Sequence, residues 1–315
     1  MTKKEFYYPS ADGETQIHAI RWEPEGEPKA ILQIIHGMVE FIDRYNDFAT
    51  FLAEEGFLVT GEDHLGHGAS VKSDEYHGYF GEKGNEWVIA DIHKLRQMTH
   101  DEFPDTPYLM LGHSMGSFLI RQYITEDDAS YADGLTGVIV MGTAWQPDAV
   151  MKFGKLLAKM RGIDDPTGDA SNIEKISFGS YLKRIDNPKT ISDWITRDDE
   201  IVAKYRANPW CTFSFTPNAY YHMFDGMLKA HDKKRMQKLP AGLPILFCAG
   251  AEDPVGNYGE GVRKAFQEYV KNTDCDVQLK IYDDDRHEIL NELDKDKVYQ
   301  DMLGFINYCL DKQSN

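Results

Sequence analysis

The chain has 315 residues, which suits one large domain with an insertion, and 42% of them are hydrophobic, enough for a sizeable core. Its 52 acidic and 34 basic residues give a formal net charge of −18, which excludes nucleic acid as a partner because the phosphate backbone would repel it. No stretch approaches the roughly 18 apolar residues of a membrane span, and the first residues contain no apolar signal core.

Four cysteines are scattered along the chain without a C-x-x-C pair. This spacing indicates reduced, mostly buried thiols and neither a disulfide framework nor a zinc site. Together with the missing signal core, it leads us to expect a cytoplasmic protein. The cysteines are Cys211, Cys248, Cys275 and Cys309.

The first part of the chain alternates predicted strands with predicted helices. Residues 5–8 and 14–22 alternate polar and apolar side chains around an Asp-Gly pair, which predicts a β-hairpin. Further on, continuous apolar runs predict buried strands, and apolar residues at helical spacing predict the helices between them. These strands are 30–35, 57–60, 108–111 and 135–141, and the helices are 45–55, 87–100 and 117–124.

This alternation stops at about residue 144 and resumes at about residue 239. The segment between contains helical patches and aromatic-rich loops, which we interpret as an inserted cap. Alternating strands and helices predict a doubly wound, mostly parallel sheet that binds ligands at the carboxyl ends of its strands. The later strands are 244–249 and 277–282, and the later helices are 258–270 and 297–310. The predicted domains are a core of 1–143 and 239–315 and a cap, or lid, of 144–238.

The stretch 108–121 contains the only G-x-S-x-G pattern in the chain, at residues 112–116. A strand before it and a helix after it, with almost no loop, are typical of a nucleophile elbow, which lifts a serine hydroxyl above the sheet edge. A Cβ at Gly112 or Gly116 would collide with neighbouring elements. The helix N-terminus would stabilise an oxyanion next to Ser114. The alternative is an ordinary glycine-rich turn.

A serine nucleophile needs a base within hydrogen-bond reach, and the base needs an orienting group. Sheets with such an elbow supply them in the order serine, acid, histidine. Asp253 and His287 both follow predicted strands, so they should lie at the sheet edge that carries Ser114. We therefore assign Ser114 as nucleophile, His287 as general base and acid, and Asp253 as the carboxylate that orients the imidazole.

Other interpretations of these two residues stay open. Glu252 lies beside Asp253, and the acidic run 283–285 lies close to His287. Asp253 could be a turn residue before Pro254, and His287 could be an ordinary histidine in a surface loop.

The oxyanion of the reaction needs two backbone donors. One is the N–H after the nucleophile, at Met115, and we place the other at Met38, in the loop after the predicted strand 30–35. The alternative for the His36-Gly37 pair is a strand end with a satisfied histidine.

Six motifs resemble those of the monoglyceride lipase and lysophospholipase group of α/β-hydrolases, which is also grouped with the serine aminopeptidase-like hydrolases. The likeness covers nearly the whole chain, and the elbow with His before and Met after the serine is more specific than G-x-S-x-G alone. The motifs are 36–40 (HGMVE) with Arg44-Tyr45, 63–70 (DHLGHGAS), 112–116 (GHSMG), 215–222 (FTPNAYYH), 253–256 (DPVG) and His287-Glu288.

The resemblance implies an α/β-hydrolase fold with an eight-stranded, mostly parallel sheet. It also implies hydrolysis of a single-acyl ester, a glyceride or a lysophospholipid, under a mobile lid. Glu40 and Arg44 would lie near the polar head of the substrate, although a capping residue and a surface charge at a helix start are the alternative. Family members often have a small residue, glycine and Glu-His after His-Gly, whereas this chain has Met38, Val39 and Glu40-Phe41, which leaves the head group open.

The cap contains one strongly amphipathic segment, 149–160. Its apolar side chains share a face flanked by three lysines, which indicates a lid that contacts a lipid surface and lines an acyl pocket, or a cap helix that packs on the core. An aromatic cluster at 210–224 would wall the pocket or form the core of the cap. The residues that we expect to contact the acyl chain are Phe153, Leu157, Trp210 and Tyr221.

These observations predict a serine carboxylester hydrolase of monoacyl lipids, a monoacylglycerol lipase or lysophospholipase, that works through an acyl-enzyme without a metal or cofactor. Two other enzyme classes stay open. One is an aminopeptidase or iminopeptidase in which Glu40 binds the substrate amine, and the other is an acyl thioesterase. A binding protein on a hydrolase fold is the alternative outside them, although such a protein gains nothing from an intact triad. Ser114 excludes haloalkane dehalogenase chemistry, which needs Asp at the elbow. The oligomeric state stays open.

Overall fold

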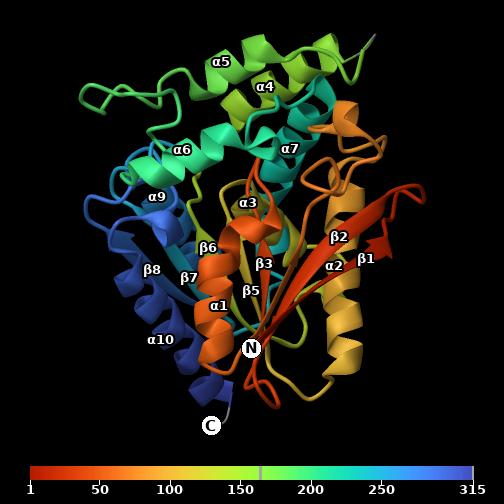
Figure 1. The fold of residues 1–315 in the computed structure, drawn as a ribbon, viewed down its shortest axis with the longest axis vertical. Coiled ribbons are helices and arrows are strands. Elements are labelled where there is room, and N and C mark those ends of the chain that lie inside the picture. Colours follow the sequence, from red (N-terminus) through yellow and green to blue (C-terminus); the bar gives the residue numbers. More distant parts are fainter. Residues whose placement is uncertain (163–164, 314–315) are drawn as a thin grey trace.

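The computed structural model describes residues 1–162 and 165–313, which form one eight-stranded sheet with helices on both faces (Figure 1). The strand order is β1-β2-β4-β3-β5-β6-β7-β8. The pairs β1–β2 and β2–β4 are antiparallel and all others are parallel, which confirms the predicted mostly parallel sheet. The strands are β1 Thr2–Pro9, β2 Gln16–Glu23, β3 Ile31–Ile35, β4 Leu58–Glu62, β5 Tyr108–His113, β6 Leu135–Met141, β7 Pro244–Gly250 and β8 Asp276–Tyr282.

Every strand and helix predicted for the core is present, with bounds that differ by a few residues. The helix α1 and the C-terminal α10 pack on one face of the sheet, and α2, α3 and α9 pack on the other. These helices are α1 Asn46–Glu54, α2 Asn85–Glu102, α3 Met115–Tyr123, α9 Glu260–Asn272 and α10 Lys295–Gln313.

The central strands are apolar on both faces because helices cover both. In β3, for example, Ile31 and Ile35 join the cluster under α2 and α3, whereas Leu32 and Ile34 join the cluster under α1 and α10. The period of two thus sends alternate side chains of one strand into opposite halves of the core.

Between β6 and β7 the chain leaves the sheet and forms a helical layer above it, where Figure 1 shows α4, α5, α6 and α7. The helices are α4 Asp148–Arg161, α5 Ser171–Phe178, α6 Asp199–Ala207, α7 Pro217–Ala230 and α8 Lys233–Met236. These helices occupy the segment in which the sequence predicts a cap. The domain boundaries at residues 144 and 238 stay a prediction.

Candidate active site

The turn between β5 and α3 has the geometry of a nucleophile elbow. Ser114 has a φ of +53° and a ψ of −118°, a conformation that a residue with a side chain rarely adopts. A Cβ on Gly112 would lie 2.3 Å from the carbonyl oxygen of Gly116, and a Cβ on Gly116 would lie 2.0 Å from that of Ile35. The predicted collisions are confirmed, and they explain why both positions are glycine.

Asp253 and His287 lie together at the same edge of the sheet. Nδ1 of His287 is 3.0 Å from Oδ1 of Asp253, and the two residues are 3% and 0% exposed, respectively. The same Asp253 oxygen accepts a hydrogen bond from the N–H of Val255 at 2.8 Å, which fixes the carboxylate. Because the contact uses Nδ1, Nε2 is the ring nitrogen left for proton transfer.

The end of β6 brings this pair to the elbow. The N–H of Ser114 donates to the carbonyl oxygen of Met141 at 3.0 Å. A Cβ on the next residue, Gly142, would lie 3.1 Å from Cε1 of His287. Ser114 and His287 therefore lie against neighbouring residues at the end of β6, an arrangement that supports the predicted triad, whose roles stay a prediction.

The imidazole of His287 lies between the elbow and the helical layer. Its ring centroid is 4.7 Å from that of His113 and 5.1 Å from that of Trp194. The contact of Trp194 could not be predicted from the sequence, because no local pattern connects this residue with a histidine so distant along the chain. Its ring limits the orientations that the imidazole can adopt.

Two backbone N–H groups near Ser114 are suited to an oxyanion. Met115 is the first residue of α3, so its N–H has no carbonyl partner within the helix. Within residues 1–162 and 165–313, the N–H of Met38 has no hydrogen-bond partner. The backbone at Gly37 approaches the nucleophile closely, since a Cβ there would lie 3.0 Å from Cβ of Ser114. The oxyanion assignment stays a prediction that this geometry supports.

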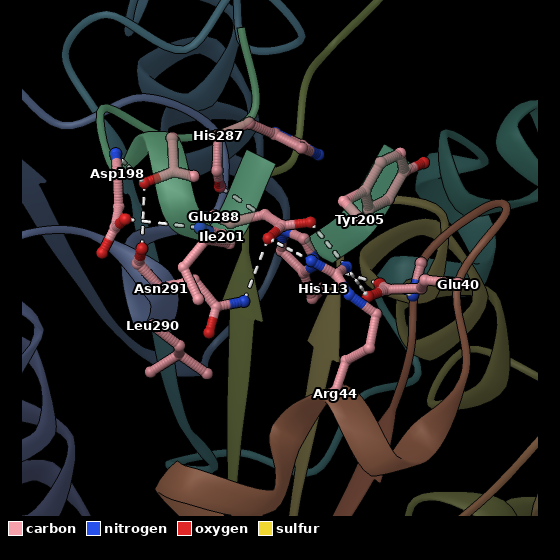
Figure 2. Close-up of polar contacts among 12 residues, drawn as sticks. Glu40, Arg44, His113, Asp198, Ile201, Tyr205, His287, Glu288, Leu290 and Asn291 are labelled. Atoms are coloured by element: carbon pink, nitrogen blue, oxygen red, sulfur yellow. Dashed lines mark hydrogen bonds and ion pairs between the residues drawn. The ribbon is translucent and has the colours of Figure 1, made fainter. Parts of the chain in front are cut away.

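Glu40 and Arg44 belong to a buried network, which Figure 2 shows. Nη1 of Arg44 donates to Glu40 at 2.7 Å, and both terminal nitrogens donate to Glu288 at 2.7 and 2.6 Å. The side chain of Arg44 is only 10% exposed, so the interpretation of Arg44 as a surface charge is wrong. Contact of either residue with a substrate head group stays a prediction.

The charges next to the nucleophile stabilise one another. Burial favours the neutral form of Glu40, but a hydrogen bond with His113 and the charge of Arg44 outweigh it and hold the pKa of Glu40 well below its usual range. Burial likewise disfavours a charged His113, yet the hydrogen bond and charge of Glu40 raise the pKa of His113 above its ordinary value. Tyr45 donates its hydroxyl to Glu40 at 2.9 Å and completes the cluster.

The four residues predicted to contact the acyl chain have different surroundings. Phe153 is 57% exposed, whereas Leu157 is half-buried. Trp210 packs on Phe41 with ring centroids 5.2 Å apart, and Tyr221 lies under the ammonium of Lys155, 4.8 Å from ring centroid to Nζ. Their roles in an acyl pocket stay predictions.

The apolar face of α4 is turned outward. Met151 and Ala158 are buried, and a Cβ on Gly154 would lie 2.8 Å from the ring of Phe224 in α7, so this side of α4 faces the protein. The interpretation of the amphipathic segment as a cap helix that packs its apolar face on the core is therefore wrong. The outward side chains, each more than half exposed, are Val150, Phe153, Leu156 and Met160.

One group of carboxylates in the described part of the chain is compact enough to hold a metal ion: Asp285, Glu292 and Asp294. The guanidinium of Arg197 contacts all three, at 2.6, 2.9 and 2.6 Å. The Arg197 guanidinium already supplies a cation to these three side chains, so we assign no metal to the group. Among the described helices, none has the length and apolar character needed to cross a membrane.

Comparisons with known proteins show which enzymes this chain is similar to. A monoacylglycerol lipase of Mycolicibacterium smegmatis is 26% identical over 309 residues, which cover 97% of each chain. A thermostable carboxyl esterase from Bacillus coagulans, solved in complex with glycerol, is 33% identical with a TM-score of 0.87, over 98% of this chain and 99% of that one. A monoglyceride lipase from Saccharomyces cerevisiae, at 18% identity and a TM-score of 0.76 over 98% and 96%, shares the fold. The model of the serine aminopeptidase S33 family matches residues 26–294, and the chain belongs to this family.

Proposed function

We propose that this protein is a serine carboxylester hydrolase of monoacyl lipids, either a monoacylglycerol lipase or a lysophospholipase. The single observation that carries the proposal is the convergence of Ser114, His287 and Asp253 at one edge of the sheet, with Ser114 held in a strained elbow. The names of the relatives support the substrate class, since they include a monoacylglycerol lipase and a carboxyl esterase.

The reaction proceeds through an acyl-enzyme. Oγ of Ser114 attacks the ester carbonyl while Nε2 of His287 takes its proton, and the N–H groups of Met38 and Met115 stabilise the oxyanion. His287 then protonates the leaving alcohol, and the acyl group stays on Ser114. Water attacks this ester with His287 as base, which releases the fatty acid and restores the serine. Asp253 holds the imidazole tautomer and stabilises the imidazolium in both steps.

The buried state of Glu40 disfavours the aminopeptidase alternative. An aminopeptidase would need a carboxylate free to bind a substrate ammonium, whereas Glu40 is 3% exposed and accepts hydrogen bonds from Gly37, Arg44 and Tyr45. An acyl thioesterase would use the same serine, so only substrate turnover separates it from an esterase.

The outward face of α4 supports a transient contact with an anionic lipid surface. Helix α4 carries four basic side chains and one acidic one in a protein of net charge −18, and its exposed apolar side chains would enter the boundary between head groups and acyl chains. Lys152 and Lys159 are exposed on its flanks and complement phosphate groups. This contact would bring the site to substrates dispersed in a membrane.

A labelling and turnover experiment tests the function. A fluorophosphonate probe should form an adduct on Ser114 of the wild-type protein but not of Ser114→Ala, and His287→Ala should react far more slowly. A panel of a monoacylglycerol, a lysophosphatidylcholine, an acyl-CoA and an aminoacyl-arylamide then identifies the substrate class. Turnover confined to the arylamide or the thioester, or a wild-type protein without an adduct, would overturn the proposal.

A further inference from the structure

A chain of contacts joins the loop of the predicted oxyanion donor to the loop of His287, two segments at opposite ends of the sequence. On the first loop, Glu40 accepts a hydrogen bond from the N–H of Gly37, the residue before Met38. On the second, Glu288 directly follows His287. Arg44 lies between these carboxylates and donates to both (Figure 2).

The bridge is rigid because its groups are buried and its geometry is bidentate. Glu40 is 3% exposed and Glu288 is 5% exposed, so little water screens their attraction to Arg44. Two parallel N–H to oxygen contacts fix the orientation of the Arg44 guanidinium relative to Glu288. The distance between the two loops is thereby restricted.

The hydrogen-bonding capacity of this bridge is largely used within the protein. Oε2 of Glu288 also accepts from the side-chain amide of Asn291 at 3.0 Å. The face of the Arg44 guanidinium lies against the ring of Tyr205, 4.8 Å from Cζ to the ring centroid. The Tyr205 hydroxyl in turn donates to the carbonyl oxygen of Val39 at 3.2 Å, so α6 holds the same loop from above.

We propose that Arg44 is a positioning residue that fixes the predicted oxyanion donor at Met38 relative to the imidazole of His287, and that Glu40 and Glu288 are its two anchors. The inference rests on the proposed function and deepens it. It differs from the expectation that Glu40 and Arg44 contact the substrate head group: positioning affects acylation of every substrate, whereas a head-group contact affects only substrates that carry the head.

The test uses substrates without a glycerol or phosphate head. Wild type, Arg44→Met, Arg44→Lys and Glu288→Gln are compared by kcat and KM on p-nitrophenyl butyrate and by the rate constant for fluorophosphonate labelling of Ser114. We expect Arg44→Met to lower kcat and the labelling rate by about 100-fold with little change in KM, as displacements near 1 Å do at catalytic sites. Arg44→Lys, which keeps the charge but loses the bidentate contact, should recover part of the loss.

Arg235 provides the matched control. Its side chain is 14% exposed and forms an ion pair at 2.7 Å with Glu126, whose side chain is 24% exposed, and it lies in α8, outside the three loops of the triad. We expect both Arg235→Met and Arg44→Met to lower the melting temperature, but Arg235→Met should leave the labelling rate unchanged.

The outcomes separate this inference from the function on which it rests. If wild type is not labelled, the proposed function fails. Suppose that wild type is labelled and that Arg44→Met only raises KM for a monoacylglycerol. Arg44 is then a head-group contact, and the positioning role is wrong. Should Arg44→Met fail to fold, kcat and the labelling rate of the isosteric variant Glu288→Gln and of Arg44→Lys test the positioning role instead. The double variant of these two should lose no more activity than the worse single variant, because both disturb one bridge, and additive losses would overturn the proposal.

Discussion

The strained backbone at Ser114 cannot relax, because neighbouring backbone atoms pack closely against the elbow. The N–H of Ser114 bonds to Met141, and the elbow on either side of it packs against backbone atoms of neighbouring elements. Of the two glycines, Gly116 has the closer approach, because the carbonyl oxygen of Ile35 would lie 2.0 Å from its Cβ. A flexible side chain could move aside, but a carbonyl in the central strand β3 cannot.

We therefore expect Gly116→Ala to lower both the melting temperature and fluorophosphonate labelling of Ser114. Gly304 is the control. It is a solvent-exposed residue in the middle of α10, and a Cβ added there would have no neighbouring atom within 4 Å. Gly304→Ala should keep the labelling rate and stabilise the protein by about 0.5–1 kcal/mol, because alanine favours helix more than glycine does. Wild-type labelling in Gly116→Ala would show that the elbow can relax, contrary to this account.

Because of Asp91, a buried residue in α2, we expect the free energy of unfolding of the protein to depend on pH. Burial is the largest influence on this carboxyl and raises the pKa of Asp91 to about 7, against the hydrogen bonds from Ser10 and Ala11 that favour its charged form. The folded state thus binds the proton more tightly than the unfolded state, where the pKa is about 3.9. The contribution to stability is complete below about pH 4 and is lost as the pH rises to about 7.

Asp91→Asn removes this titration and keeps a neutral polar side chain of the same shape. We expect the melting temperature of Asp91→Asn minus that of wild type to increase between about pH 5 and pH 7.5 and then to stay level. Thermal unfolding across this range measures it. A difference that does not vary with pH would show that Asp91 is ionised in the folded protein.

At the scale of the element, α4 shows what a periodic pattern can and cannot predict. The spacing of its apolar side chains indicated a helix, and α4 spans Asp148–Arg161. Periodicity also indicates which side chains share a face, but not whether that face meets the protein or the solvent. The small residues Gly154 and Ala158 allow α7 to approach α4 on the other side, so the large apolar side chains point outward.

If this face contacts lipid, its removal should affect interfacial substrates alone. We expect Val150→Ser combined with Met160→Ser to weaken binding to phosphatidylglycerol vesicles by about tenfold or more, the equivalent of 1.4 kcal/mol. Hydrolysis of a dissolved aryl ester should stay unchanged. Val270→Ser, which alters an equally exposed apolar side chain on α9, should change neither property. Equal vesicle binding by all three proteins would contradict the lipid contact.

The sequence predicted the elements and the order of the site loops, because runs of apolar residues, glycine turns and strand ends are local signals. It did not predict what Arg44 contacts. The bond from Arg44 to Glu288 joins residues 244 positions apart, and nothing in either local sequence indicates the other. Trp194 beside His287 was missed for the same reason. The motif placed Glu40 and Arg44 near the site but did not show whether they face the substrate or the protein.

At the scale of the whole molecule, the helical layer and the core are joined at the loop that carries His287. Arg197 contacts Asp285, Glu292 and Asp294 of the core, and burial is the main cause that raises the pKa of Asp285 to about 7. The N–H of Glu288 donates to the carbonyl oxygen of Ile195 at 2.8 Å. A movement of the layer that admits substrate must keep these contacts or displace His287. We therefore expect the moving part to be α4 and α5, with the segment 193–197 as a fixed anchor.

Hydrogen exchange tests this division of the layer. The amides of Arg197 and Arg286 both donate to Oε1 of Glu292, at 3.1 and 2.8 Å, so they should exchange slowly in the wild type, whereas amides of α4 and α5 should exchange faster. Arg197→Met should accelerate exchange of the amides at positions 197 and 286 and lower kcat, because the contacts of Arg197 with the loop of His287 are lost. Lys189→Met is the control, since Lys189 forms a solvent-exposed ion pair with Asp199 that contributes little. Fast exchange of these two amides in the wild type would show that the anchor is not fixed, and unchanged exchange there in Arg197→Met would show that Arg197 does not hold it.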